Sequence, residues 1–187
     1  GGAGKQTLNV YNWGDYIDED IIKDFEKKYD VNVIYETFAT NEEMYTKLKG
    51  GGSDYDVLFP SDYMLERMIK EDILEKIDHS NIPNFKYIEE RFKNLSYDPD
   101  NEYSVPYMWG TIGIIYNKTM VKEPVDSWKV LWDKKYKKQI FMLDSSRDTI
   151  AITLKMLGYS INTRDIDELE ETKKALIEQK PLVLSYT

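Results

Sequence analysis

Hydrophobic and polar residues recur with two different periods along the first part of the chain. Leu8 and Val10 alternate with polar neighbours, which is typical of a strand, and residues 18–29 then carry an apolar stripe at helical spacing. The same order of a strand-like run and a helical run recurs over residues 31–48 and residues 55–68. Because strands that alternate with helices build βαβ units, the pattern predicts an α/β fold with a mainly parallel sheet.

Charge and capping signals mark the ends of these predicted helices. The first helix begins near Asp18 with acidic residues and ends with Lys27 and Lys28, an order that suits the helix dipole. Residues 40–43 (TNEE) form a capping box, and residues 50–53 (GGGS) predict a flexible turn. Each helix is therefore expected to begin shortly after a strand ends.

The second half of the chain is less regular. Residues 72–102 are rich in turn-forming residues, whereas residues 112–116, 139–143 and 182–186 read as apolar strands and residues 166–178 as a charged amphipathic helix. The last strand-like run reaches the end of the chain, so we expect an unfinished second lobe. An unpaired apolar edge there would favour self-association or pairing with a complementing chain.

The most distinctive stretch is residues 11–16 (YNWGDY), where the first predicted strand opens into a loop. Trp13, Asp15 and Tyr16 place two large rings beside a carboxylate. Such a group suits a cation that carries methylenes, because the rings cover the chain and the carboxylate takes the charge. The alternative is a tryptophan that covers the core beside an aspartate that caps the next helix, and the hexapeptide alone leaves both open.

Two further strand ends carry candidate residues. Ser61 and Tyr63 follow the strand-like run at residues 55–59, and Ser145 and Asp148 open the helix after a later strand. Ligands of parallel sheets bind beyond the carboxyl ends of the strands, so the loop at residues 11–16 and the segment of Ser61 and Tyr63 are expected to converge. Ordinary helix capping is the structural alternative for both serines and for Asp148.

Composition narrows the function classes. The chain has 187 residues, a formal net charge of -9, no cysteine and one histidine, His79. The acidity argues against nucleic acid as a partner, and the lack of cysteine excludes disulfides, thiolate nucleophiles and cysteine-bound metals. His79 lies in a polar, loop-like context, so catalysis by histidine is not expected, nor is a metal or a cofactor. No apolar run approaches the ~18 residues of a membrane span.

Several segments, in order, resemble one family, the bacterial polyamine-binding proteins that serve as spermidine/putrescine receptors of ABC importers. The resemblance begins near Leu8 and extends over nearly the whole chain. The segments that carry it are residues 11–16, 41–48, 55–61, 103–110 and 157–160.

The resemblance implies a type II periplasmic-binding fold, in which two α/β lobes close around a ligand. Residues 7–110 would form the first lobe, and residues 111–187 a crossover strand with the first part of the second lobe. Residues 1–6 would be a tether or a scar of cloning. The resemblance also implies binding without catalysis, a membrane permease as partner, and a location in the periplasm or, through a lipid anchor, at the outer face of the cell membrane.

By position, the resemblance also implies a set of polyamine-binding residues. In this set Trp13 is a ring of the cleft, Asp15 an ammonium partner, and Asp148 an acidic residue that opens a helix of the second lobe. Ser145 stands where the spermidine receptor has another carboxylate, which removes one ammonium contact expected for the longer triamine. The implied residues are Trp13, Asp15, Tyr16, Ser61, Tyr63 and Asp148.

Other readings of the same residues remain open. A receptor of this fold could bind another small cation or a carboxylated solute. An enzyme could use Asp15 and Asp148 as acid and base, although the chain has no nucleophile motif to accompany them. In a third reading, the aromatic loops form a protein-binding patch of an interaction domain.

Overall fold

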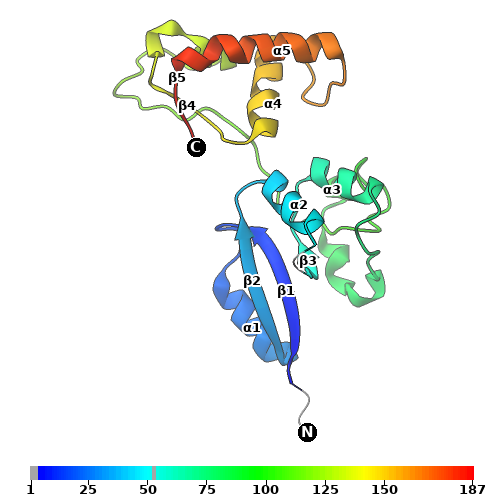
Figure 1. The fold of residues 1–187 in the computed structure, drawn as a ribbon. Coiled ribbons are helices and arrows are strands. Elements are labelled where there is room, and N and C mark those ends of the chain that lie inside the picture. The colour runs from blue at the N-terminus through cyan, green and yellow to red at the C-terminus, as the bar shows by residue number, and fades with distance from the viewer. Residues whose placement is uncertain (1–3, 52–53) are drawn as a thin grey trace. The chain divides into compact units, whose positions relative to one another are not determined.

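The structure, a computed structural model, describes residues 4–51 and 54–187 and divides into two compact units (Figure 1). The first unit ends at Trp109 and the second runs from Gly110 to Thr187. The predicted turn at residues 50–53 and the predicted tether at residues 1–6 lie partly outside the described residues. The predicted lobe boundaries of residues 7–110 and 111–187 stay a prediction, because a compact packing unit does not by itself define a lobe.

The first unit is built on a parallel three-stranded sheet in the order β2-β1-β3. Its β1 pairs with β2 along its whole length but with β3 only at Val10 and Tyr11. Parallel pairing and alternation with helices confirm the predicted α/β class. In chain order the elements are β1 (Gln6–Trp13), α1 (Glu19–Tyr29), β2 (Val31–Phe38), α2 (Asn41–Lys49), β3 (Val57–Leu58) and α3 (Asp62–Lys70).

The core of the first unit lies between this sheet and two helices. Met44 of α2 and Met64 and Met68 of α3 are buried against Tyr11 and Phe38. The capping box forms, with Thr40 at its head, because Oγ1 of Thr40 accepts from the Glu43 amide at 3.1 Å. The apolar stripe of α1 differs, since Ile21, Phe25 and Tyr29 remain exposed.

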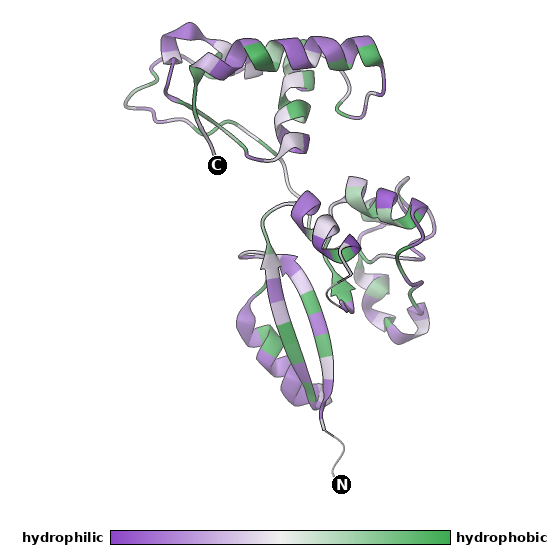
Figure 2. Ribbon diagram, in the orientation of Figure 1, coloured by the Kyte–Doolittle hydropathy of each residue, from purple (hydrophilic) through white to green (hydrophobic). Residues whose placement is uncertain are grey.

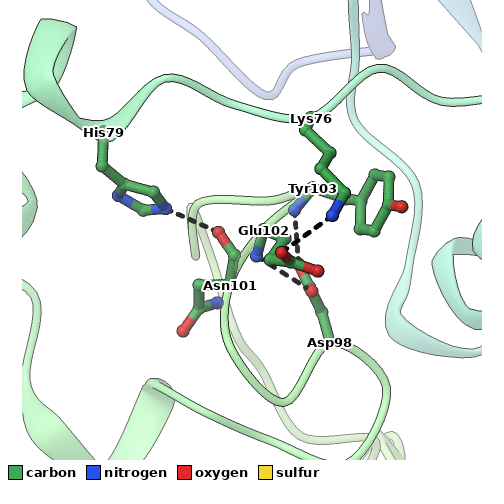
Figure 3. A network of polar contacts seen from close by, with 6 residues as sticks. All are labelled: Lys76, His79, Asp98, Asn101, Glu102 and Tyr103. Carbon is green, nitrogen blue, oxygen red and sulfur yellow. Dashed lines mark hydrogen bonds and ion pairs between the residues drawn. The ribbon is translucent and has the colours of Figure 1, made fainter.

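Three short 3-10 turns and a buried carboxylate organise the rest of the first unit. The Asp98 side chain is 3% exposed and accepts hydrogen bonds from the Glu102 and Tyr103 amides and the Ser104 hydroxyl. Figure 3 shows Asp98 with Glu102 and Tyr103, and it also shows Lys76, which pairs with Glu102. The predicted irregular region therefore has a polar framework of its own. The turns are η1 (His79–Asn81), η2 (Pro83–Tyr87) and η3 (Glu90–Phe92).

The second unit has a parallel pair of strands, β4 and β5, and two α-helices. Its buried core consists of Ile140, Met142, Ile152, Leu182 and Val183. As predicted, α5 is a charged helix, and Figure 2 shows it hydrophilic along most of its length with hydrophobic residues at intervals. The elements are η4 (Trp128–Trp132), η5 (Lys134–Tyr136), β4 (Ile140–Met142), α4 (Ser146–Leu157), α5 (Ile166–Gln179), η6 (Lys180–Leu182) and β5 (Val183–Tyr186).

The predicted strand at residues 112–116 is wrong. These residues have no regular structure, and Ile115 is fully exposed. A strand needs a hydrogen-bonding neighbour as well as apolar side chains, and no described strand pairs with this segment. The strand predicted at residues 182–186 forms as β5, and association through its edge stays a prediction. In the described parts of the chain, no helix has the length and apolarity needed to cross a membrane.

We expect Asp98→Asn to lower the free energy of unfolding by about 2–4 kcal/mol in urea denaturation. An amide has one acceptor oxygen, so its NH₂ group would face donors that the carboxylate now satisfies. Asp100→Asn is the matched control, because Asp100 is exposed and undergoes the same chemical change nearby. Equal losses in the two variants would contradict the buried network.

Candidate ligand site at the strand ends of the first unit

Trp13 is the last residue of β1 and is held from two sides. Its indole Nε1 donates a hydrogen bond of 2.8 Å to the Phe59 carbonyl, just past β3. Its ring centroid lies 4.6 Å from that of Phe38, the last residue of β2. The ring is half-buried, so it packs on the core and also presents a face to the surface. The two readings left open for Trp13 are therefore compatible.

Asp15 follows in a tight loop and is exposed. Its φ of 53° lies in the left-handed region, which aspartate tolerates better than most residues. Asp18, not Asp15, caps α1, since the Asp18 carboxylate accepts from the Asp20 amide. The reading of Asp15 as a helix cap is therefore wrong. Within residues 4–51 and 54–187, no hydrogen bond or ion pair engages its carboxylate.

A hollow of about 490 Å³ opens beside this loop at the carboxyl ends of β1 and β2. Rings and carboxylates occur together in it, so its chemistry suits an ammonium group on an apolar stem. Sequence reasoning missed Glu43, because the capping box already explained that residue; its Oε2 accepts from the Ala39 amide at 2.9 Å. The hollow is lined by Trp13, Gly14, Asp15, Thr37, Phe38, Ala39 and Glu43.

Tyr16 is not among the described residues that line the hollow, but its ring lies beside that of Trp13. Its ring centroid lies 6.3 Å from Trp13 and 5.7 Å from Tyr107. Tyr107 also donates its hydroxyl to the Tyr16 carbonyl at 2.6 Å and packs edge-on against Phe59 at 4.9 Å. Sequence reasoning did not select Tyr107 as a site residue, and its place in an aromatic-rich run was the one available signal.

Ser61 is positioned by Asn41 rather than used as a cap. It stands at the N-cap position of α3, but its side chain makes no capping hydrogen bond. Asn41 accepts from the Ser61 amide at 2.8 Å and donates to the Ser61 hydroxyl oxygen at 3.0 Å. Because a backbone N–H can only donate, this pair fixes which end of the Asn41 amide faces the serine. One lone pair and the hydroxyl proton of Ser61 then remain for other contacts.

Tyr63 is more committed to the fold than its predicted role suggests. Its ring packs against the core of the first unit, and its hydroxyl donates to Glu42 Oε1 at 2.9 Å. The structure thus brings Trp13, Asp15 and Tyr16 together on one loop and links them through Phe59 to the segment of Ser61 and Tyr63. Direct contact of Ser61 or Tyr63 with a ligand stays a prediction.

Asp148 belongs to the second unit, so its convergence with the other candidate residues stays a prediction. It lies in the first turn of α4, where its amide donates to the Ser145 hydroxyl at 3.3 Å. Ser145 therefore caps the helix, as the spacing suggested. In the described parts of the chain, no partner engages the Asp148 carboxylate.

The first unit already holds one alkylammonium in the way expected for a ligand. The Lys47 ammonium lies 2.5 Å from Glu36 and 5.0 Å and 5.6 Å from the ring centroids of Tyr11 and Tyr55. The hydrogen bond between Lys47 and Glu36 raises the pKa of Lys47 and lowers the pKa of Glu36. On this scaffold a carboxylate therefore favours the charged form of an amine that lies over two rings.

The acidic residues and the one histidine also bear on metal binding and on catalysis. Among residues 4–51 and 54–187, no group of three or more histidines and acids is arranged to hold a metal ion. His79 has structural contacts, since its Nε2 lies 2.6 Å from the Asn101 carbonyl (Figure 3). Its ring also meets Phe85 edge-on.

Comparison with known proteins finds similarity along most of the chain. A family model described as bacterial extracellular solute-binding protein matches residues 20–182. The spermidine/putrescine-binding periplasmic protein of Salmonella typhimurium is 37% identical over 182 residues, with 96% of this chain and 52% of the relative covered. The putrescine-binding periplasmic protein SpuD of Pseudomonas aeruginosa is 36% identical over 200 residues, with 98% and 54% covered.

Solved structures give the same result. A Listeria monocytogenes protein assigned as a spermidine/putrescine ABC transporter matches with a TM-score of 0.92 and 44% identity, covering 97% of this chain and 57% of that one. The TpPotD lipoprotein of Treponema pallidum matches with a TM-score of 0.89 and 37% identity, with 97% and 57% covered. The chain spans about half the length of the curated relatives it matches.

These matches confirm the resemblance drawn from the ordered segments, and they confirm the predicted fold class. The family and these relatives are named for solute binding or transport, and none of the names describes an enzyme. Since the family model matches most of the chain, the chain belongs to the bacterial extracellular solute-binding protein family.

Proposed function

We propose that the protein carrying this chain is the polyamine-binding component of an ABC importer, and that it binds putrescine or spermidine outside the cytoplasm. The observation that carries the proposal is the hollow at the strand ends, where the rings of Trp13 and Phe38 and the exposed carboxylate of Asp15 line one space. The names of the relatives support the substrate class, because they bind spermidine or putrescine.

The physical chemistry of a polyamine matches this lining. Its methylenes need apolar walls and its ammonium groups need carboxylates. Each desolvated cation–π contact contributes up to about 2 kcal/mol, and each charge-assisted hydrogen bond about 1.5–3 kcal/mol before desolvation. Trp13 and Tyr16 would cover the methylenes, and Asp15 would receive one ammonium. Ser61 and Tyr63 would add polar contacts from the neighbouring strand end.

A second ammonium needs a second carboxylate, and Asp148 of the second unit is the proposed partner. Closure of two lobes would bring both carboxylates to one ligand. The N-terminus of a helix disfavours a cation, so a carboxylate in the first turn of α4 has to outweigh the helix dipole. That requirement argues for direct contact between Asp148 and the amine.

The role requires binding and release, without a chemical step. A membrane permease would receive the polyamine from the closed protein. The protein would work in the periplasm, or at the outer face of the cell membrane if it carries a lipid anchor. A receptor for another small solute on the same fold is the alternative, and comparative calorimetry with putrescine, spermidine and a carboxylated solute separates the two.

Asp15→Asn is expected to weaken putrescine binding by about 1–3 kcal/mol with little change in melting temperature, because an exposed charge partner is lost. Isothermal titration calorimetry measures the first effect and thermal melting the second. Asp24→Asn, at another exposed aspartate, is the matched control. A sharp drop in melting temperature with unchanged ligand heat would instead give Asp15 a structural role.

Trp13→Ala is expected to abolish detectable polyamine binding and to destabilise the fold, because both the contact with Phe38 and the hydrogen bond to Phe59 are lost. Trp13→Phe keeps a ring and loses only the N–H donor, which should lower the free energy of unfolding by about 0.5–1.5 kcal/mol. It should therefore retain most of the affinity. Equal binding losses in the two variants, measured by calorimetry, would rule out a ring contact with the ligand.

Ser145→Asp is expected to improve spermidine affinity by about 5-fold or more relative to putrescine, since it adds a carboxylate for the third amine. Folding should be retained, because aspartate is as good an N-cap as serine. Ser145→Asn, which also caps but carries no charge, is the control. A spermidine gain of the same size in the asparagine variant would show that charge is not the cause.

A further inference from the structure

Tyr107 joins the two strand ends that carry the candidate site, although it lies 91 residues along the chain from Tyr16. Its hydroxyl donates to the Tyr16 carbonyl at 2.6 Å, and its ring contacts Tyr16 at 5.7 Å and Phe59 at 4.9 Å. One side chain thus touches the loop after β1 and the segment after β3.

The segment that delivers Tyr107 is itself firmly held. Asp98 accepts hydrogen bonds from the amides of Glu102 and Tyr103 (Figure 3). The Glu102 carbonyl accepts from the Ile77 amide at 2.7 Å. The Asn101 side chain is buried and accepts from the Asn94 amide at 2.8 Å. The residues before Tyr107 are therefore ordered by hydrogen bonds to their backbone.

The loop that Tyr107 contacts has little else to order it. Asp15 is exposed in a left-handed conformation, and its carboxylate has no partner among residues 4–51 and 54–187. For residues 14–17, the hydrogen bond from Tyr107 is the only one that reaches them from a distant segment of the described chain.

We propose that Tyr107 is a positioning residue that preorganises the ligand loop, residues 14–16, before the polyamine arrives. The inference rests on the proposed function, since it assigns that loop to the ligand. Neither Tyr107 nor Tyr16 is among the described residues that line the hollow, so Tyr107 acts through the backbone of Tyr16 on the loop that carries Asp15. A loop that is already ordered loses less conformational freedom on binding, which increases the affinity.

The test is Tyr107→Phe, which removes the hydroxyl and keeps the ring contacts. Tyr103→Phe is the matched control, because no described residue makes a hydrogen bond to the Tyr103 hydroxyl. Hydrogen exchange of the amides at residues 14–17 is measured without ligand, and the Kd for putrescine is measured by calorimetry. Both substitutions are then repeated in the Asp15→Asn background.

We expect Tyr107→Phe to speed exchange at residues 14–17 and to raise the Kd for putrescine about 3- to 10-fold, the size of one neutral hydrogen bond. In the Asp15→Asn background this factor should fall towards one, because the loop then has no charge to position. Tyr103→Phe should leave exchange and affinity unchanged.

Two results would overturn the inference: unchanged exchange at residues 14–17, or a Kd factor that persists in full without the Asp15 carboxylate. The second would mean that Tyr107 supports the fold and not the ligand loop. Failure of the proposed function looks different. There, Asp15→Asn alone leaves putrescine binding unchanged, while the exchange measurement still decides whether Tyr107 orders the loop.

Discussion

The parallel pairing of β1 with β2 and β3 is the constraint on which the candidate site depends. Strands that run the same way deliver the residues after them to one edge of the sheet. Trp13 shows the consequence, because its ring meets Phe38 at the end of β2 and its N–H meets the Phe59 carbonyl beyond β3. If either neighbour were antiparallel, one of these contacts would lie at the opposite edge, and the hollow would lose a wall.

The charge of the expected ligand then decides what must line that edge. An ammonium loses hydration when it enters a site, so rings alone do not hold it unless a carboxylate compensates. Lys47 obeys the same rule within the fold, since its ammonium lies over two tyrosine rings and also pairs with Glu36. Asp15 offers a carboxylate of this kind beside Trp13, but no described side chain forms a hydrogen bond or an ion pair with it. An unengaged carboxylate of this kind is what the proposed binding role of Asp15 requires.

Sequence reasoning succeeded where local signals determine structure and failed where distant contacts do. The capping box at Thr40, the alternation around Val10 and the cap at Ser145 each depend on residues a few positions apart, and the structure contains all of them. The apolar run at residues 112–116 looked equally strand-like, but a strand also needs a partner that a local pattern cannot reveal. Tyr107 was missed for the same reason, because its contacts with Tyr16 span the first unit.

The electrostatic field at these strand ends has the wrong sign for a cation. Helices of an α/β unit begin where the strands finish, and their positive N-termini favour anions at that edge. A site for cations has to reverse this field. The helices that follow the candidate strand ends all carry acids in their first turns: Glu19 and Asp20 in α1, Glu42 and Glu43 in α2, Asp62 in α3 and Asp148 in α4. Each such acid stabilises its own helix and also offsets the positive charge that would repel an amine. Stabilising a helix N-terminus and recognising a cation are therefore compatible roles for the same carboxylate, so the place of Asp148 in the first turn of α4 does not argue against the proposed role in binding.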